Sequence, residues 1–232
     1  MPFSRKKPEI QGGLSGTALK YIAMTTMLAD HIGAVLLERI VYYRGNLEQV
    51  AMLMTSQWGD TLYWLWRMLR TVGRIAFPIY CFLLVEGFLH TRDWRRYWLR
   101  MAAFALISEI PFRLAVWNTW AGGSSNVYVE LAIGLLVLRG LKQSEGLTQP
   151  RRAAGMAAVI GGGCLAAVFL KADYDMDGIL IISLFYLLRE KRIVQVMSGG
   201  ILSLLESWNM CYGAGILSSV PLYFYNGKKG QA

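Results

Sequence analysis

Long hydrophobic stretches alternate with short polar connections along most of this chain. A straight transmembrane helix needs about 20 apolar residues, and the longer stretches reach that length. The pattern predicts eight membrane-spanning helices, over residues 18–38, 73–90, 98–117, 126–141, 153–171, 177–189, 193–208 and 210–226. The last three are short for a straight span, so we expect tilted or broken helices there. The predicted fold class is an all-α polytopic membrane protein.

The longest connection in this pattern covers residues 39–72. Its second half is amphipathic and rich in Trp and Tyr. Such a composition favours one or two helices lying along the outer membrane interface. The alternative is an extra, distorted span, which would invert the topology of everything that follows.

Composition supports the membrane assignment. Hydrophobic residues make up 55% of the 232 residues and charged residues only 17%, against about 25% in soluble domains. No polar linker interrupts the apolar segments, so residues 1–232 are expected to form a single integral membrane domain. Runs of glycine within these segments suit close helix packing in lipid.

The net charge of +9 is a topology signal. Most Lys and Arg residues fall in the connections that face the cytoplasm if both chain ends do, as the positive-inside rule requires. Nucleic-acid binding is therefore not expected, although basic patches can favour it.

Asp30 and His31 stand next to each other inside the apolar run 19–38. Each ionisable side chain at membrane depth costs roughly 2.5–3.5 kcal/mol, so a partner, a cavity or a chemical task must offset it. His31 is one of two histidines and is suited to proton transfer near neutral pH. The alternatives are a packing histidine, and an Asp30 that only orients His31 or pairs with an arginine.

Other polar residues fall near the outer ends of the predicted spans. Several segments contribute them at one depth, which suggests a shared polar cavity. They are Arg74, Glu109, Arg113, Asn126, Glu130, Asp173, Tyr174, Asp175 and Asp177. Arg74 snorkelling to the interface, Glu109 pairing with Arg113 or capping a helix, and a solvated aspartate turn are the alternatives.

A metal site is not expected. The run DYDMDG at 173–178 faintly resembles a calcium loop, but the required acidic residue at its twelfth position is Leu184. The three cysteines lie inside apolar runs at spacings that match no metal or redox pattern, so they are expected to pack in the interior.

A second polar group lies near the predicted inner face. Arginine guanidinium groups suit phosphate, so this group is a candidate anion site; the alternative is an ordinary topology signal. Its members are Glu86, His90, Arg92, Arg95, Arg96 and Arg100.

Five motifs in this order resemble the TraX family of conjugal-transfer proteins: DH at 30–31, GRIAFP at 73–78, EGFLHTR at 86–92, SEIPF at 108–112 and the Asp-Tyr turn at 173–175. The resemblance implies a membrane N-acetyltransferase of bacterial inner membranes, similar to wider multi-span acyltransferases that use cytoplasmic acetyl-CoA. The chain departs from the family pattern at Arg113, Glu130 and Asp175, and these departures put the acceptor in doubt.

The resulting hypothesis is acetyl transfer from acetyl-CoA to an acceptor amine or hydroxyl at the outer side. His31 would be the general base, Asp30 its support and Arg74 the group that stabilises the developing oxyanion. Acetyl-CoA would be bound by Arg92, Arg95, Arg96, Glu86 and His90, and the acceptor by Glu109, Asn126, Asp173 and Tyr174.

The expected partners are membrane lipids and an acceptor of open identity: a protein N-terminus, a sugar, a lipid or a small molecule. A proton-coupled small-molecule transporter, with Asp30, His31 and Glu109 as a proton relay, is the alternative. A non-catalytic membrane scaffold held together by its polar pairs is a third possibility.

Overall fold

The computed structural model describes residues 12–43, 55, 58–120 and 122–230. Every regular element in these residues is a helix, so the all-α prediction is confirmed for this part of the chain. The chain divides into two compact units, Met1–Leu83 with Leu188–Ala232, and Leu84–Leu187. Each unit is described by itself below.

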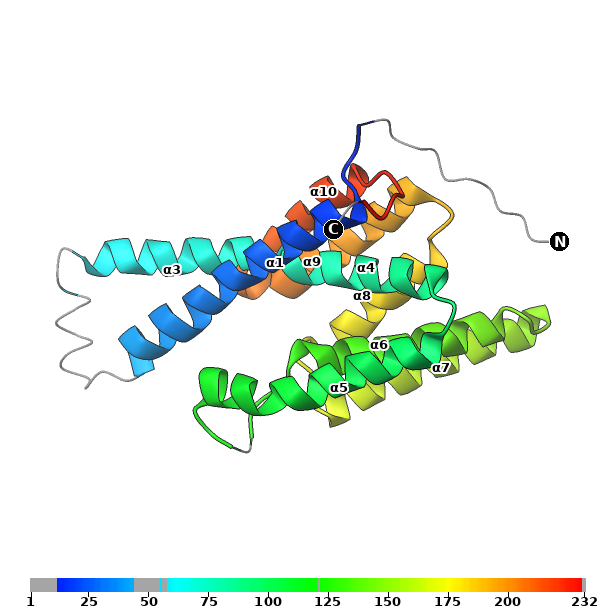
Figure 1. The fold of residues 1–232 in the computed structure, drawn as a ribbon, viewed down its shortest axis with the longest axis horizontal. Coiled ribbons are helices and arrows are strands. Elements are labelled where there is room, and N and C mark those ends of the chain that lie inside the picture. Colours follow the sequence, from blue (N-terminus) through cyan, green and yellow to red (C-terminus); the bar gives the residue numbers. More distant parts are fainter. Residues whose placement is uncertain (1–11, 44–54, 56–57, 121, 231–232) are drawn as a thin grey trace. The chain divides into compact units, whose positions relative to one another are not determined.

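The first unit contains the first and last helices of the chain. Helix α1 (Gly16–His31) continues into the π-helical segment η1 (Ile32–Tyr43). Helix α3 (Gly59–Gly73) packs along α1 and also contacts α9 (Arg192–Cys211). Figure 1 shows α1 and α3 side by side. The segments η3 (Ala214–Ser218) and α10 (Ser219–Tyr223) then fold back against α9.

Helix α4 (Ala76–His90) follows α3 after only two residues, Arg74 and Ile75. Pro78 explains this irregularity, because a proline ring clashes with the carbonyl four residues earlier, here that of Arg74. Together α3 and α4 form a 32-residue helical run, Gly59–His90, that is long and apolar enough to cross a membrane. The predicted boundary before residue 73 is therefore a tightened turn, in which the amides of Arg74 and Ile75 donate to the carbonyls three residues earlier. Residues 44–54 and 56–57 of the predicted interfacial stretch lie outside the described residues.

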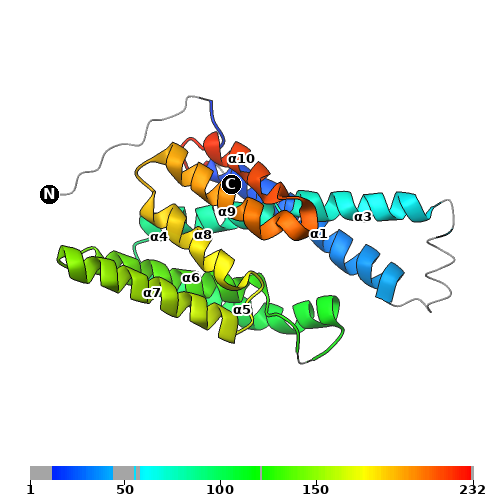
Figure 2. The ribbon, with the colours of Figure 1, turned by 180° about the vertical axis from the view of Figure 1, so that it is seen from behind.

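The second unit is built around α6 (Val127–Ser144). This helix contacts α5 (Trp94–Phe112), α7 (Gln149–Phe169) and α8 (Asp175–Leu187). Helices α5, α6 and α7 lie side by side in both ribbon views (Figure 1, Figure 2). The short π-helical segment η2 (Arg113–Trp117) extends α5. Because three helices surround α6, its leucines form much of the core of this unit.

Glycines allow some of these helices to approach closely. A Cβ at Gly163 of α7 would overlap the Val137 side chain of α6, and a Cβ at Gly134 would lie 2.5 Å from Ile182 of α8. Gly161 and Gly162, in contrast, face open space, with no atom within 4 Å of an added Cβ. Close packing by small residues is therefore specific to certain positions in each glycine run.

Each of the eight predicted segments has a helical counterpart, and the last, 210–226, is short and broken, as its length led us to expect. Tyr212 and Gly213 adopt left-handed backbone angles, with φ of 51° and 75°, and end α9. Only the short helical stretch Ala214–Tyr223 follows, which is half of a straight span. By length and composition, two described helices qualify as membrane spans, Gly59–His90 and Gln149–Phe169. The full set of eight crossings stays a prediction.

The two ends of the described chain are hydrogen-bonded to each other. The backbone amides of Gly16 and Thr17, in the first turn of α1, donate to the carbonyls of Lys228 and Lys229 at 2.8 and 2.9 Å. Amides in the first turn of a helix have no partner within that helix, so the C-terminal segment completes the start of α1. The N-terminal and C-terminal segments therefore lie side by side in the first unit.

Candidate functional site

Four charged side chains from three helices meet in the first unit. Arg70 Nη1 donates a hydrogen bond of 2.7 Å to Asp30 Oδ2, and Arg74 Nη2 lies 3.6 Å from Asp30 Oδ1. Arg74 Nη1 lies 3.6 Å from Glu206 Oε1 on α9. All four side chains are largely buried, with exposed fractions of 10–19%. We call Asp30, Arg70, Arg74 and Glu206 the charged network.

Glycines on both helices make room for the network. A Cβ at Gly73 would overlap the Asp30 side chain, and a Cβ at Gly33 would lie 3.2 Å from Leu69 Cβ and 3.3 Å from Arg70 Cδ. The absence of a side chain at these two positions brings α1 and α3 within ion-pair distance. Arg70 of α3 and Arg74, which directly follows α3, thus reach a carboxylate near the end of α1.

His31 makes a different contact from that of its neighbour Asp30. Its Nδ1 lies 2.9 Å from the backbone carbonyl of Met27, one helical turn earlier. A carbonyl oxygen only accepts, so Nδ1 must carry the hydrogen, and the neutral ring keeps its basic lone pair on Nε2. This places a proton acceptor at the end of α1.

The two residues of the DH motif therefore have separate partners. Asp30 contacts the arginines of α3 and His31 contacts its own helix, and no hydrogen bond joins them among the described residues. Successive helical positions point about 100° apart, which accounts for the separation. Of the expected roles for Asp30, pairing with an arginine is the one that its geometry displays.

In the second unit, Asn126 and Glu109 form a polar junction between α5 and α6. Asn126 caps the start of α6: its side-chain oxygen accepts from the amide of Tyr128 at 2.9 Å. Its Nδ2 donates to the Ala105 carbonyl at 2.8 Å and to Glu109 Oε2 at 2.6 Å. Arg113 Nε donates to Glu109 Oε1 at 2.6 Å. The pairing of Glu109 with Arg113, expected as an alternative, is present.

The aspartate turn precedes α8. Asp173 is exposed and Tyr174 is partly buried, and the Tyr174 carbonyl accepts the amides of Asp177 and Gly178 at 3.0 and 3.3 Å. The turn therefore starts a helix. Within the described part of the chain, no three His, Cys, Asp or Glu side chains come close enough to hold a metal ion.

Glu130 lies beside this turn and is the most buried carboxyl group described. Its exposed fraction is 0%, and neither carboxylate oxygen has a hydrogen-bond partner. The carboxylate packs against Gly178, where an added Cβ would lie 2.5 Å from Glu130 Oε1. A buried polar group without a hydrogen bond is costly, so this position stands out in the unit.

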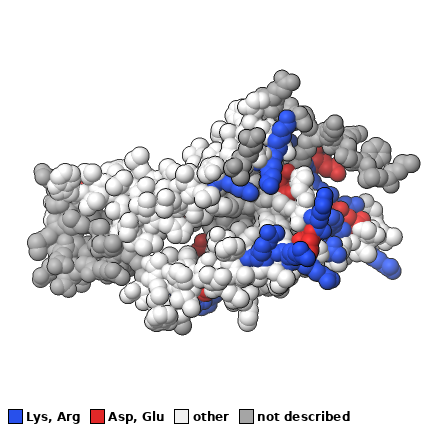
Figure 3. Space-filling view, viewed as in Figure 1, with Lys and Arg blue, Asp and Glu red and all other residues white. Residues whose placement is uncertain are grey.

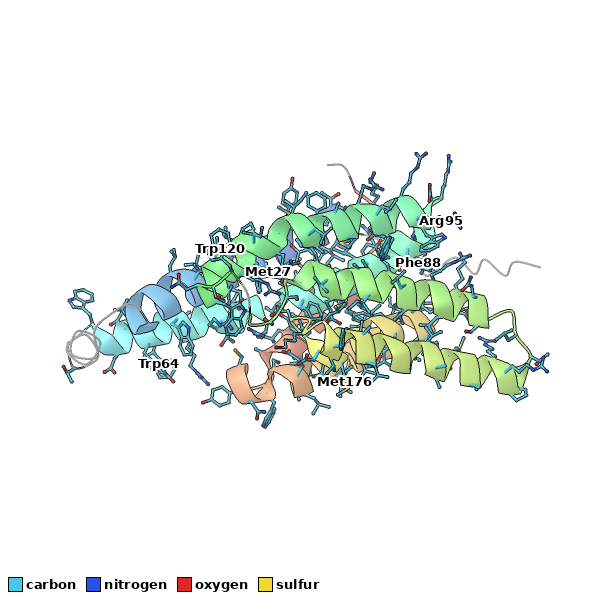
Figure 4. All side chains as sticks on the ribbon, turned by 90° about the horizontal axis from the view of Figure 1, so that it is seen from below. Met27, Trp64, Phe88, Arg95, Trp120 and Met176 are labelled. Atoms are coloured by element: carbon cyan, nitrogen blue, oxygen red, sulfur yellow. The ribbon has the colours of Figure 1, made fainter. Side chains whose placement is uncertain are left out.

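The residues predicted to bind acetyl-CoA lie where α4 ends and α5 begins. Asp93 caps α5 by accepting from the amides of Arg95 and Arg96, and its other oxygen lies 3.1 Å from Arg96 Nε. The side chains of Arg92, Arg95 and Arg96 are exposed. Figure 3 shows Lys and Arg gathered over the start of α5, and Arg95 points away from the helices in Figure 4. An exposed set of guanidinium groups suits a phosphate-bearing ligand.

Two further predicted residues of this set belong to α4. Glu86 is buried, and His90 Nδ1 lies 2.7 Å from the Glu86 carbonyl. His90 thus repeats the arrangement of His31, with its basic lone pair on Nε2. Two basic residues of α6 also lie near the end of α4 and the start of α5. Arg139 lies 5.3 Å from the ring centre of Trp94, and Lys142 lies 5.7 Å from that of Phe88.

The predicted site residues are divided between the two units. Asp30, His31 and Arg74 belong to the first, whereas the predicted acetyl-CoA and acceptor residues belong to the second. The structure pairs Asp30 with Arg74 in the first set, and Asn126 with Glu109 and His90 with Glu86 in the second. A cavity shared by both sets stays a prediction.

Sequence reasoning missed Arg70, Glu206 and Gly73. Glu206 carried a usable signal, because it is the single acidic residue of an otherwise apolar helix, as Asp30 is in α1. Arg70 carried a weaker signal, four residues before Arg74 on the same helical face. Only the tertiary contact with Asp30 reveals the role of Gly73.

Long apolar helices joined by buried ion pairs are typical of an integral membrane protein. The TraX protein family matches residues 15–213, which include the whole charged network. The chain belongs to the TraX family. It is similar to the "Probable fimbrial assembly protein FimC, serogroup H1" of Dichelobacter nodosus, with 28% identity over 216 residues and 80% of each chain covered. No solved structure matches the chain.

Proposed function

We propose that this TraX-family protein is a membrane-embedded acyltransferase that moves an acetyl group from cytoplasmic acetyl-CoA to an acceptor amine or hydroxyl at the outer side of the membrane. The observation that carries the proposal is His31, whose Nδ1 is committed to the Met27 carbonyl and whose Nε2 is thereby the basic nitrogen. It follows Asp30 in sequence, and Asp30 pairs with two guanidinium groups of the kind that suits a developing negative charge.

In the proposed reaction, His31 Nε2 takes the proton of the acceptor as its nitrogen or oxygen attacks the thioester carbonyl. Arg74 stabilises the oxyanion that forms. The carbon–sulfur bond then breaks, and the sulfur of CoA leaves as a thiol after receiving the proton from His31. Arg92, Arg95 and Arg96 bind the phosphates of acetyl-CoA, with Glu86 and His90 completing that set.

Glu109, Asn126, Asp173 and Tyr174 are proposed to shape the acceptor site. The name of the Dichelobacter nodosus relative makes a fimbrial subunit the first acceptor to test. Paired chain ends and the distribution of basic residues support a bacterial inner-membrane location with both termini in the cytoplasm.

The charged network favours the enzyme over the transporter alternative. A proton relay needs a carboxylate that binds and releases protons readily. Asp30 faces two guanidinium groups, at 2.7 and 3.6 Å, so each protonation would disrupt these ion pairs. The Nδ1 of His31 is hydrogen-bonded to a carbonyl of its own helix. Proton uptake at its Nε2 therefore does not require an ion pair to be disrupted.

The test is acetyl-CoA turnover by the purified protein in lipid nanodiscs, with His31→Ala and His90→Ala compared. General base catalysis contributes about 10²–10⁴-fold, so His31→Ala is expected to lower kcat by that factor. His90→Ala, which alters the other histidine with the same backbone contact, is expected to raise the KM for acetyl-CoA with little change in kcat.

Absence of acetyl-CoA binding by the folded protein would overturn the proposal. Substrate-driven proton flux in vesicles, without any acetyl transfer, would favour the transporter instead. A His31→Ala variant with the kcat of the wild type would remove His31 from the mechanism.

A further inference from the structure

We infer that Glu206 on α9 is a positioning residue, which holds the Arg74 guanidinium in place from the side opposite Asp30. The inference rests on the proposed function, because Arg74 is the residue proposed to stabilise the oxyanion. It brings α9 into the site, a helix from which the sequence had suggested no functional residue.

The geometry of Arg74 supports this inference. Its two terminal nitrogens face carboxylates from two different helices, Nη2 toward Asp30 on α1 and Nη1 toward Glu206 on α9, each at 3.6 Å. A guanidinium group is planar, so attraction at both terminal nitrogens restrains the orientation of its plane as well as its location. A second carboxylate on another helix therefore adds a restraint on orientation that Asp30 does not provide.

The charge balance explains why Asp30 is not sufficient. Its shortest contact, 2.7 Å, belongs to Arg70, so Asp30 is shared between two guanidinium groups. Glu206 supplies the second negative charge that two buried arginines need. With exposed fractions of 10% for Arg74 and 19% for Glu206, the attraction acts with little screening by water.

The sequence of α9 agrees with a specific role. Glu206 is the single acidic residue between Arg192 and Cys211. A charge inside an apolar helix is costly and is kept where it has a partner or a task. Its partner is Arg74, at the junction of α3 and α4, so Glu206 connects the site to α9 as well as to α1.

Three variants test the inference: Glu206→Gln removes the charge, Glu206→Asp keeps the charge on a shorter side chain, and Glu190→Gln alters an exposed glutamate as the matched control. Two readouts are measured on the full chain in nanodiscs. One is acetyl-CoA kinetics, and the other is the rate at which phenylglyoxal modifies Arg74, followed by peptide mass spectrometry.

Glu206→Gln is expected to lower kcat by about tenfold or more while leaving the KM for acetyl-CoA unchanged, because a small displacement of a stabilising group has effects of this order. Modification of Arg74 should become faster in the same variant. Glu206→Asp should recover much of the loss in kcat, and Glu190→Gln should match the wild type in both readouts.

A purely structural tie would give a different result. Glu206→Gln would then lower the melting temperature, while the kcat of the folded fraction and the modification rate of Arg74 stayed at wild-type values, and the inference would be wrong. If the wild type itself transfers no acetyl group, the proposed function fails. The modification rates then decide alone whether Glu206 positions Arg74.

Discussion

In the first unit each carboxylate of the charged network faces a guanidinium group, whereas in the second unit the fully buried carboxyl of Glu130 has no hydrogen-bond partner. Both Asp30 and Glu130 nevertheless sit against a glycine of a neighbouring helix, Gly73 and Gly178 respectively. Both carboxylates thus pack where a neighbouring glycine has no side chain, but only Asp30 forms ion pairs. The network joins α1, the junction of α3 and α4, and α9 by ion pairs, while Glu130 lies between α6 and α8 near the aspartates of the 173–177 turn and makes no ion pair among the described residues.

Comparing the two carboxylates therefore separates the effect of packing against a glycine from the effect of an ion pair. Removing one member of a buried ion pair leaves an uncompensated charge, which is costly. Neutralising a buried group that has no partner removes no interaction. Substitutions of similar shape at the two carboxylates should therefore have effects of very different size.

Asp30→Asn is expected to have the largest effect. Both arginines of α3 lose their shared counter-charge, so the free energy of unfolding should fall by about 3 kcal/mol. Denaturant titration of the protein in detergent micelles measures this loss. The double variant Asp30→Asn with Arg70→Gln should cost less than the sum of the single changes. Additive costs would show that the two residues do not form a network.

Gly73→Ala tests the packing that makes the network possible. The added methyl group would overlap Asp30, so we expect a loss of about 1–3 kcal/mol in unfolding free energy. Gly161→Ala is the matched control, because an added Cβ there meets no atom within 4 Å. The control should be neutral or stabilise α7 by up to about 1 kcal/mol. Equal effects of the two variants would contradict a specific role for Gly73.

Asn126→Ala tests the polar junction of the second unit. The variant removes the cap of α6 and the hydrogen bonds to Glu109 and Ala105, so we expect a cost of about 1–2 kcal/mol in thermal unfolding. Thr148→Ala is the control, since Thr148 precedes α7 without a side-chain capping bond. A cost at Thr148 as large as that at Asn126 would contradict the role of the junction.

Glu130→Gln is expected to have the smallest effect and completes the comparison. Because its oxygens have no hydrogen-bond partner, the substitution should change the free energy of unfolding by less than about 1 kcal/mol. The measurement is the same denaturant titration used for Asp30→Asn. A loss of about 3 kcal/mol would mean that Glu130 takes part in an interaction comparable to the ion pairs of the first unit.

The sequence predicted the helices better than the contacts between them. Long apolar runs identified eight helical segments, since apolar length is a local property. The length of 210–226 indicated a broken helix, but hydropathy could not locate the break, because it is insensitive to backbone angles: the apolar character continues past Tyr212, where the chain turns into the left-handed region. The irregular turn at Arg74 and Ile75 was similarly hidden, although Pro78 marks it.

For the candidate site, isolated charges in apolar runs gave a correct indication of where polar contacts occur. Asp30 and Arg74 were singled out in this way, and their ion pair is present. Their partners depend on which helices meet, and one sequence contains no such information. Adjacency in sequence suggested a functional pair at positions 30 and 31, yet helical geometry sends the two side chains to different partners.

The pairing of the chain ends has a consequence for how the protein is made. The first turn of α1 is completed by the carbonyls of Lys228 and Lys229, more than 200 residues later in the chain. A ribosome makes the N-terminus first, so α1 enters the membrane before its hydrogen-bond partners exist. The helix that carries Asp30 and His31 is therefore completed only after a segment more than 200 residues later has been synthesised. Until then, the first turn of α1 needs other partners for these two amides.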